Sequence, residues 1–196
     1  MMIMGVDEAG RGALVGDVVA AAVVLPERYH LPKLNDSKQI SAKVRESLFT
    51  AITEQALAYG IAHATPDEID ALNIHHATLL AMQRAIEAVQ KALCHQNFGE
   101  IEVLVDGKFV PNIDYHAKAI VGGDASVPSI AAASILAKVT RDRTLLRLHE
   151  KYPEYGFHQH KGYATSKHLE AIKRFGALPE HRHSFAPLKS QQLSLF

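Results

Sequence analysis

Residues 2–12 read MIMGVDEAGRG, and this stretch joins an apolar run to two adjacent carboxylates and a glycine-rich loop. The run before Asp7 has the length and composition of a buried strand. Neighbouring strand residues point to opposite faces, so Asp7 and Glu8 share one site only if the strand ends there or if one acts through its backbone. Paired acids beside an open loop with one arginine suit a hard metal ion meeting a phosphodiester.

Patterns elsewhere in the chain predict an α/β fold, with a mixed sheet flanked by helices. The glycines that follow the first strand indicate a tight turn into a second one, so these two strands are expected to form a hairpin-like pair. Ser41 fits a helix N-cap and Pro66 a helix start. The predicted strands cover residues 3–7, 18–25, 59–64, 101–106 and 116–121, and the other predicted helices cover 77–93, 129–151 and 165–175.

The bulk composition is that of a soluble globular protein, 47% hydrophobic and 21% charged. The length of 196 residues predicts one domain, or one domain plus a small appendage. No apolar run reaches the ~18 residues of a membrane span, and no basic segment leads into a signal-peptide core. A single cysteine, Cys94, excludes an internal disulfide framework. We therefore expect a cytoplasmic protein with no membrane association, and separately we expect it to be a monomer.

The formal net charge is zero, which by itself argues against a nucleic-acid partner. The distribution of charge along the chain points the other way. Residues 1–137 carry 10 Lys and Arg against 16 Asp and Glu, and residues 138–196 carry 11 against 5. An acidic front and a basic back are compatible with metal ions on one side and phosphates on the other.

Acidic residues recur at strand ends or beside glycine, as Asp7-Glu8, Asp106-Gly107 and Gly123-Asp124. Four converging carboxylates would repel one another unless a cation neutralised them, and two divalent ions could bind such a set and clamp a phosphodiester. Each motif alone has a plainer interpretation, as a turn, a loop or a helix cap. The glycine loop also lacks the Lys-Ser/Thr ending of a P-loop. Their order and context make the combination informative.

This order of motifs resembles bacterial ribonuclease HII over nearly all of residues 3–188. The resemblance implies a ribonuclease H-like core with a small helical C-terminal extension within residues 1–188. The last stretch of the chain is polar and then apolar, so residues 189–196 are expected to form a tail. The matching segments are Asp7 to Gly12, Asn35-Asp36-Ser37-Lys38, Val105-Asp106-Gly107, Gly123-Asp124, Ala131 to Lys138, Arg141-Asp142-Arg143 and His160-Lys161-Gly162-Tyr163.

The resemblance also implies an activity. The enzyme would hydrolyse the RNA strand of RNA–DNA hybrids and incise 5′ of single ribonucleotides in duplex DNA, removing misincorporated ribonucleotides. Attack by water, assisted by Mn²⁺ or Mg²⁺, would leave 3′-hydroxyl and 5′-phosphate ends. The family's four catalytic, metal-binding acids fall on Asp7, Glu8, Asp106 and Asp124.

Substrate contacts follow from the same resemblance. Gly10, Arg11 and Gly12 fall on the family's ribonucleotide-sensing loop, and Tyr163 falls on the aromatic that stacks on the deoxyribose after the ribonucleotide. Open glycine backbone can approach the 2′-hydroxyl, the only group that separates RNA from DNA at one nucleotide. Phosphate contacts are expected from Ser37, Lys38, Lys138 and Arg141.

Three further residues receive structural interpretations. Ser134 lies in an alanine-rich run, which favours close helix packing. His158 and His160 have the spacing of a metal pair, but we favour surface or hydrogen-bonding roles.

The chain departs from the family at Ala13 and Asp17, where proline is usual. This change is expected to loosen the turn and to affect substrate binding more than chemistry.

The chain's last residues, Gln192-Leu193-Ser194-Leu195-Phe196, resemble the short motif with which bacterial proteins bind the DNA polymerase sliding clamp. Gln192 would bond at the pocket rim, and Leu193, Leu195 and Phe196 supply the apolar residues of the motif. Alternatively, these apolar residues fold back onto the domain.

Two other functions of the whole protein stay open. One is a ribonuclease HIII-like enzyme, which needs longer RNA tracts and typically carries an extra N-terminal domain. The other is an inactive nucleic-acid or clamp-binding module.

Overall fold

The structure is a computed structural model that describes residues 1–34, 40–94 and 99–189. Its centre is a five-stranded sheet with the order β3-β2-β1-β4-β5. β1 pairs antiparallel with β2 and parallel with β4, which confirms both the hairpin-like pair and the mixed sheet. The strands are β1 (Met2–Ala9), β2 (Val18–Val24), β3 (Ala58–Ala64), β4 (Ile101–Asp106) and β5 (Ala117–Ile120).

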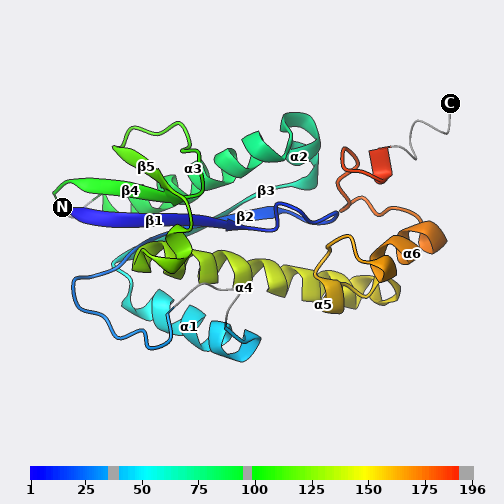
Figure 1. Ribbon diagram of the computed structural model, residues 1–196, viewed down its shortest axis with the longest axis horizontal. Helices are drawn as coiled ribbons and strands as arrows, with labels where there is room; N and C mark the ends of the chain where they lie inside the picture. The colour runs from blue at the N-terminus through cyan, green and yellow to red at the C-terminus, as the bar shows by residue number, and fades with distance from the viewer. Residues whose placement is uncertain (35–39, 95–98, 190–196) are drawn as a thin grey trace.

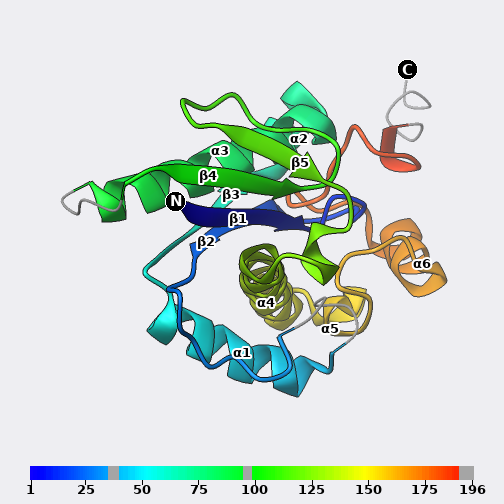
Figure 2. The same ribbon diagram turned by 60° about the vertical axis from the view of Figure 1, so that its left-hand side comes forward.

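Helices cover both faces of this sheet (Figure 1). Alternate residues of β1 and β2 pack against α3 on one face and against α4 on the other, with α1 packed outside α4 (Figure 2). The principal helices are α1 (Ala42–Gln55), α2 (Pro66–Leu72), α3 (Ile74–Leu93), α4 (Pro128–Lys151) and α6 (Ser166–Phe175). Short turns of helix are η1 (Gly123–Ala125), η2 (Pro153–Tyr155) and α5 (Phe157–His160).

The helix starts follow from local chemistry. Ser41 caps α1, as predicted, by accepting a hydrogen bond from the Val44 N–H. Thr65 and Glu68 form a capping box around Pro66. The predicted strand and helix positions are confirmed to within a few residues, whereas the three short helical turns were not predicted.

After α4, the chain forms the small helical extension that was predicted. Its core joins Phe157 and Ile172 to Leu14 and Val15, which belong to the turn after β1. The extension therefore packs directly on the glycine-rich turn. Among the described residues no helix is both long enough and apolar enough to cross a membrane.

Candidate active site

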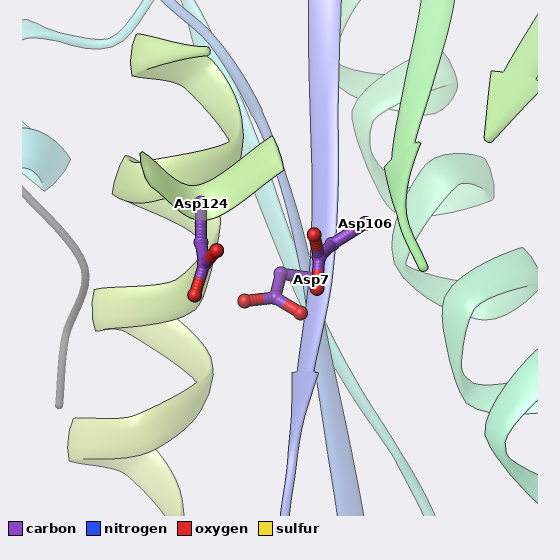
Figure 3. A group of neighbouring side chains, drawn as sticks. All are labelled: Asp7, Asp106 and Asp124. Carbon is purple, nitrogen blue, oxygen red and sulfur yellow. The ribbon is translucent and has the colours of Figure 1, made fainter. Parts of the chain in front are cut away.

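Three of the predicted acids meet at one end of the sheet. One carboxylate oxygen from each of Asp7, Asp106 and Asp124 lies within 4.8 Å of the other two. Figure 3 shows these side chains directed toward one another. Asp7 lies in β1, Asp106 is the last residue of β4, and Asp124 lies in η1. We call these three residues the acidic triad.

Close backbone packing brings the triad together. A Cβ added at Gly5 would lie 2.1 Å from the Ser129 carbonyl carbon, so only glycine lets the start of α4 approach β1 this closely. That approach brings η1, which immediately precedes α4, toward Asp7. The Asp106 Oδ1 accepts a hydrogen bond from the Gly123 N–H at 2.7 Å and links β4 to the same turn.

Electrostatics favour a cation at the triad. Burial, together with the charges of Glu8 and Asp106, raises the pKa of Asp7 well above its usual value. Among the described residues, no Lys or Arg forms an ion pair with Asp7 or Asp106. Oxygen ligands of this kind are those that Mg²⁺ and Mn²⁺ prefer, so the residues present fit a divalent metal ion.

Glu8 lies outside the set of mutually close oxygens. β1 continues through Ala9, so Asp7 and Glu8 diverge as adjacent strand residues do. Glu8 instead pairs with Arg11 at 3.6 Å. Burial raises the pKa of Glu8, Arg11 opposes this shift, and Asp106 adds to it. Three of the four acids expected to converge therefore do so, and Glu8 lies beside them. The charges of Glu8 and Asp106 still act on each other.

A cleft of about 350 Å³ adjoins Asp7. The Tyr163 ring is exposed there, 41% accessible, and a Cβ on Gly12 would lie 3.8 Å from it. Lys138 pairs with Asp142 at 2.7 Å at the same cleft. The structure thus brings the predicted loop, aromatic ring and lysine to one surface; the lining residues are Asp7, Glu8, Ala9, Gly10, Arg11, Gly12, Ser134, Lys138 and Tyr163.

Other predicted contacts are placed differently. Arg141 is buried, 2% exposed, beneath the glycine loop, where a Cβ on Gly10 would lie 2.0 Å from its Nε. Its position supports the loop, and a direct phosphate contact stays a prediction. Ser37, Lys38 and the proposed clamp residues Gln192, Leu193, Leu195 and Phe196 lie outside the described residues.

Ser134 has a role that its sequence context did not indicate. Its side chain hydrogen-bonds Asp7, which opposes the rise in the pKa of that carboxyl. Ser134 also lines the cleft. The sequence feature that could have indicated this role is a single hydroxyl within an alanine-rich helical face, a face that by itself predicts only close packing.

Histidines in the extension form neutral hydrogen-bond chains. The His160 Nδ1 accepts from the Gly162 N–H at 3.2 Å, which confirms a hydrogen-bonding role. The Leu178 N–H donates to the His181 Nδ1 at 2.9 Å, His181 and His168 join through Nε2 atoms 3.1 Å apart, and the His168 Nδ1 lies 2.9 Å from the Tyr163 carbonyl oxygen. Burial lowers the pKa of both His168 and His181 to about 4, so this chain holds the Tyr163 backbone while uncharged.

Known proteins are similar to this chain in sequence and in fold. The model of the family described as Ribonuclease HII matches residues 4–188. Ribonuclease HII of Dichelobacter nodosus is 54% identical over 187 residues, which cover 95% of each chain.

Solved structures agree with the sequence comparison. Ribonuclease H2 of Pyrococcus horikoshii is 27% identical, with a TM-score of 0.74 over 99% of this chain and 98% of the other. The Archaeoglobus fulgidus structure of a PCNA:RNase HII complex is 26% identical, with a TM-score of 0.71 over 93% and 94%. Bst-RNase HIII in complex with Mn²⁺, 18% identical, shares the fold with a TM-score of 0.76 over 99% of this chain and 70% of that one.

Proposed function

This chain belongs to the ribonuclease HII family, and from that premise we infer how its site works. The protein is a ribonuclease H that uses a divalent metal and hydrolyses the RNA strand of RNA–DNA hybrids. We propose that it also incises 5′ of single ribonucleotides in duplex DNA. The observation that carries this proposal is the acidic triad, with one oxygen of each carboxylate within 4.8 Å of the other two, beside the cleft that holds the glycine loop and Tyr163.

The triad supplies the chemistry. Asp7, Asp106 and Asp124 would hold Mn²⁺ or Mg²⁺, with Glu8 as an adjacent fourth acid. When bound there, a divalent ion would lower the pKa of water and would stabilise negative charge on the departing 3′ oxygen. The hydrogen bond from Gly123 fixes the Asp106 carboxylate, and that from Ser134 fixes Asp7. These contacts hold both side chains in place before substrate arrives. Hydrolysis would leave 3′-hydroxyl and 5′-phosphate ends.

The glycine loop and Tyr163, which line the same cleft, supply recognition. The open backbone of Gly10 and Gly12 can approach a 2′-hydroxyl. Arg11, whose side chain is 49% exposed in its pair with Glu8, can exchange that partner for a phosphate. The exposed Tyr163 ring would stack on the next deoxyribose, where a 2′-hydroxyl would crowd it. Lys138 and Arg141 would add positive charge along the phosphate backbone of the bound duplex. Ser37 and Lys38 would add hydrogen bonds to the same backbone.

A cleavage assay on matched duplexes tests this function. We expect metal-dependent cutting of a duplex with one ribonucleotide and of a uniform RNA–DNA hybrid, and no cutting of all-DNA duplex. A ribonuclease HIII-like enzyme would cut only the hybrid. An inactive binding module would bind these duplexes and cut none. Chelation of the metal by EDTA is the control for all three substrates.

We propose that residues 189–196 form a tail that binds the DNA polymerase sliding clamp. The family match ends at residue 188, and the archaeal relative was solved in a complex with PCNA. Gln192 would bond at the rim of the clamp's pocket, while Leu195 and Phe196 would bury in its apolar subsites. Binding there would bring the nuclease to newly copied DNA.

Deleting residues 192–196 should abolish clamp binding, measured by surface plasmon resonance, and leave cleavage of free oligonucleotides unchanged. The tail would then act only through the clamp. A truncated protein that melts at lower temperature and binds the clamp as before would show instead that these residues belong to the core.

We also propose that the enzyme acts as a monomer in the cytoplasm. The triad and the cleft are both built within one chain, so the described site needs no residue from a second copy. We place it in the cytoplasm because such an enzyme must reach the DNA that contains misincorporated ribonucleotides.

A further inference from the structure

Arg182 lies completely buried beneath the turn that contains the glycine loop, and its side chain is 0% exposed. Its Nη1 donates hydrogen bonds to the carbonyl oxygens of Arg11 at 2.9 Å and Ala13 at 2.7 Å. Its Nε donates to the Gly16 carbonyl oxygen at 2.9 Å. One guanidinium from the C-terminal extension therefore binds three carbonyls of residues 11–16, more than 160 positions away in the sequence.

Further donors occupy two of the remaining carbonyls of this turn. The backbone N–H of Arg182 donates to the Leu14 oxygen at 2.8 Å. The Nη2 of the buried Arg141 donates to the Val15 oxygen at 3.2 Å. Within residues 11–16, the carbonyls of all but Gly12 thus point to donors inside the protein.

This orientation decides which way the loop's N–H groups face. In a trans peptide unit the carbonyl of one residue and the N–H of the next point in opposite directions. Because the Arg11 carbonyl is bound by Arg182, the Gly12 N–H points away from Arg182. That N–H donates to no other described residue, and Gly12 lines the cleft. The Gly12 N–H is therefore an unused donor on the side of the loop away from Arg182.

Among the described residues, no carboxylate forms an ion pair with either guanidinium within 4.0 Å. The charge of Asp17 still acts on both at longer range, and that of Asp70 acts on Arg182. The Nη1 of Arg141 and the Nη2 of Arg182 are buried and have no hydrogen-bond partner among the described residues. Burial lowers the pKa of Arg182 to about 9, so it remains protonated at neutral pH. A buried charge that makes no direct ion pair is costly. A phosphate bound at the loop would offset part of that cost, because interactions in a poorly solvated site are weakly screened.

We propose that Arg182 is a positioning residue for substrate binding: its side chain holds the carbonyls of Arg11, Ala13 and Gly16 inward, leaves the Gly12 N–H open to the cleft, and attracts the substrate's phosphodiester with its positive charge. This role rests on the function proposed above. It predicts an effect mainly on substrate binding, because the charge acts on bound substrate and transition state alike.

The test compares Arg182→Met, Arg182→Lys and Ile172→Ala. Ile172 is buried in the same extension, 3% exposed, and its truncation controls for lost stability. Steady-state cleavage of a duplex with one ribonucleotide gives KM and kcat for each variant below its own melting temperature. We expect Arg182→Met to raise KM by about tenfold or more with a smaller change in kcat. Arg182→Lys should recover part of the loss, since an ammonium keeps the charge but lacks the planar fork.

A folded Arg182→Met variant with the KM of Ile172→Ala would overturn the proposal. Should the Met variant not fold, a wild-type KM in Arg182→Lys would overturn it equally. These outcomes differ from failure of the proposed function, in which the wild-type enzyme itself would not cut the single-ribonucleotide duplex.

Discussion

Asp106→Asn should reduce cleavage of an RNA–DNA hybrid by at least ~100-fold, equivalent to roughly 3 kcal/mol of transition-state stabilisation. Asparagine has nearly the same shape as aspartate, and its oxygen can still accept the Gly123 N–H bond that Asp106 accepts at 2.7 Å. The substitution therefore removes one metal-ligand charge while leaving the turn intact. Rates at saturating Mn²⁺ measure the effect, and a rate like that of the wild type would contradict the role of Asp106.

The same variant should be more stable than the wild type when metal is absent. The charge of Asp106 contributes to the raised pKa of Asp7, so its removal relieves repulsion in the folded state. We expect the metal-free variant to melt at least ~2 °C higher at neutral pH. Excess Mn²⁺ should raise the melting temperature of the wild type more than that of the variant. A lower melting temperature for the variant would indicate that Asp106 is a structural residue instead.

Tyr163→Ala should weaken single-ribonucleotide incision by ~10-fold or more and cleavage of a long hybrid by less. The ring is exposed beside Gly12 at the cleft, where it would contact the deoxyribose that follows a ribonucleotide. In a uniform hybrid the cleaved RNA strand has a ribose at that position instead. The ratio of kcat/KM on the two substrates measures this preference.

Tyr163→Phe is the matched control, because it keeps the ring and removes only the hydroxyl. It should preserve most of the preference for the junction. Equal losses on both substrates in Tyr163→Ala would mean that the ring is structural or contributes to every cleavage alike.

Local patterns in the sequence predicted the scaffold well. The apolar run that ends at Asp7 and the strand 101–106 place two of the three acids at neighbouring strand positions, since β1 and β4 pair in parallel. The Ser41 cap marked the start of α1. These features depend on residues close in the chain, where propensity and periodicity act directly.

Long-range contacts could not be predicted in this way. Nothing near Arg182 in the sequence indicates that its guanidinium binds the carbonyls of Arg11 and Gly16. The prediction of four converging acids was incomplete for a related reason. β1 runs on past Glu8, so the strand geometry turns this side chain toward Arg11 and away from the triad.

The turn at Ala13 and Asp17 shows the same limit. Two missing prolines predicted a looser turn. In the structure Ala13 is buried and its carbonyl is bound by Arg182, while Asp17 lies 3.3 Å from the His63 ring nitrogen. Contacts from distant segments hold this turn, and their effect on substrate affinity stays a prediction.

Mapping the cut in an end-labelled duplex that contains one ribonucleotide tests the central claim most directly. With Mn²⁺ present, the account predicts a single incision on the 5′ side of the ribonucleotide, leaving a 3′-hydroxyl and a 5′-phosphate, and no incision in EDTA or in Asp106→Asn. A cut at another position, or a cut that persists without metal and without the Asp106 carboxylate, would contradict it.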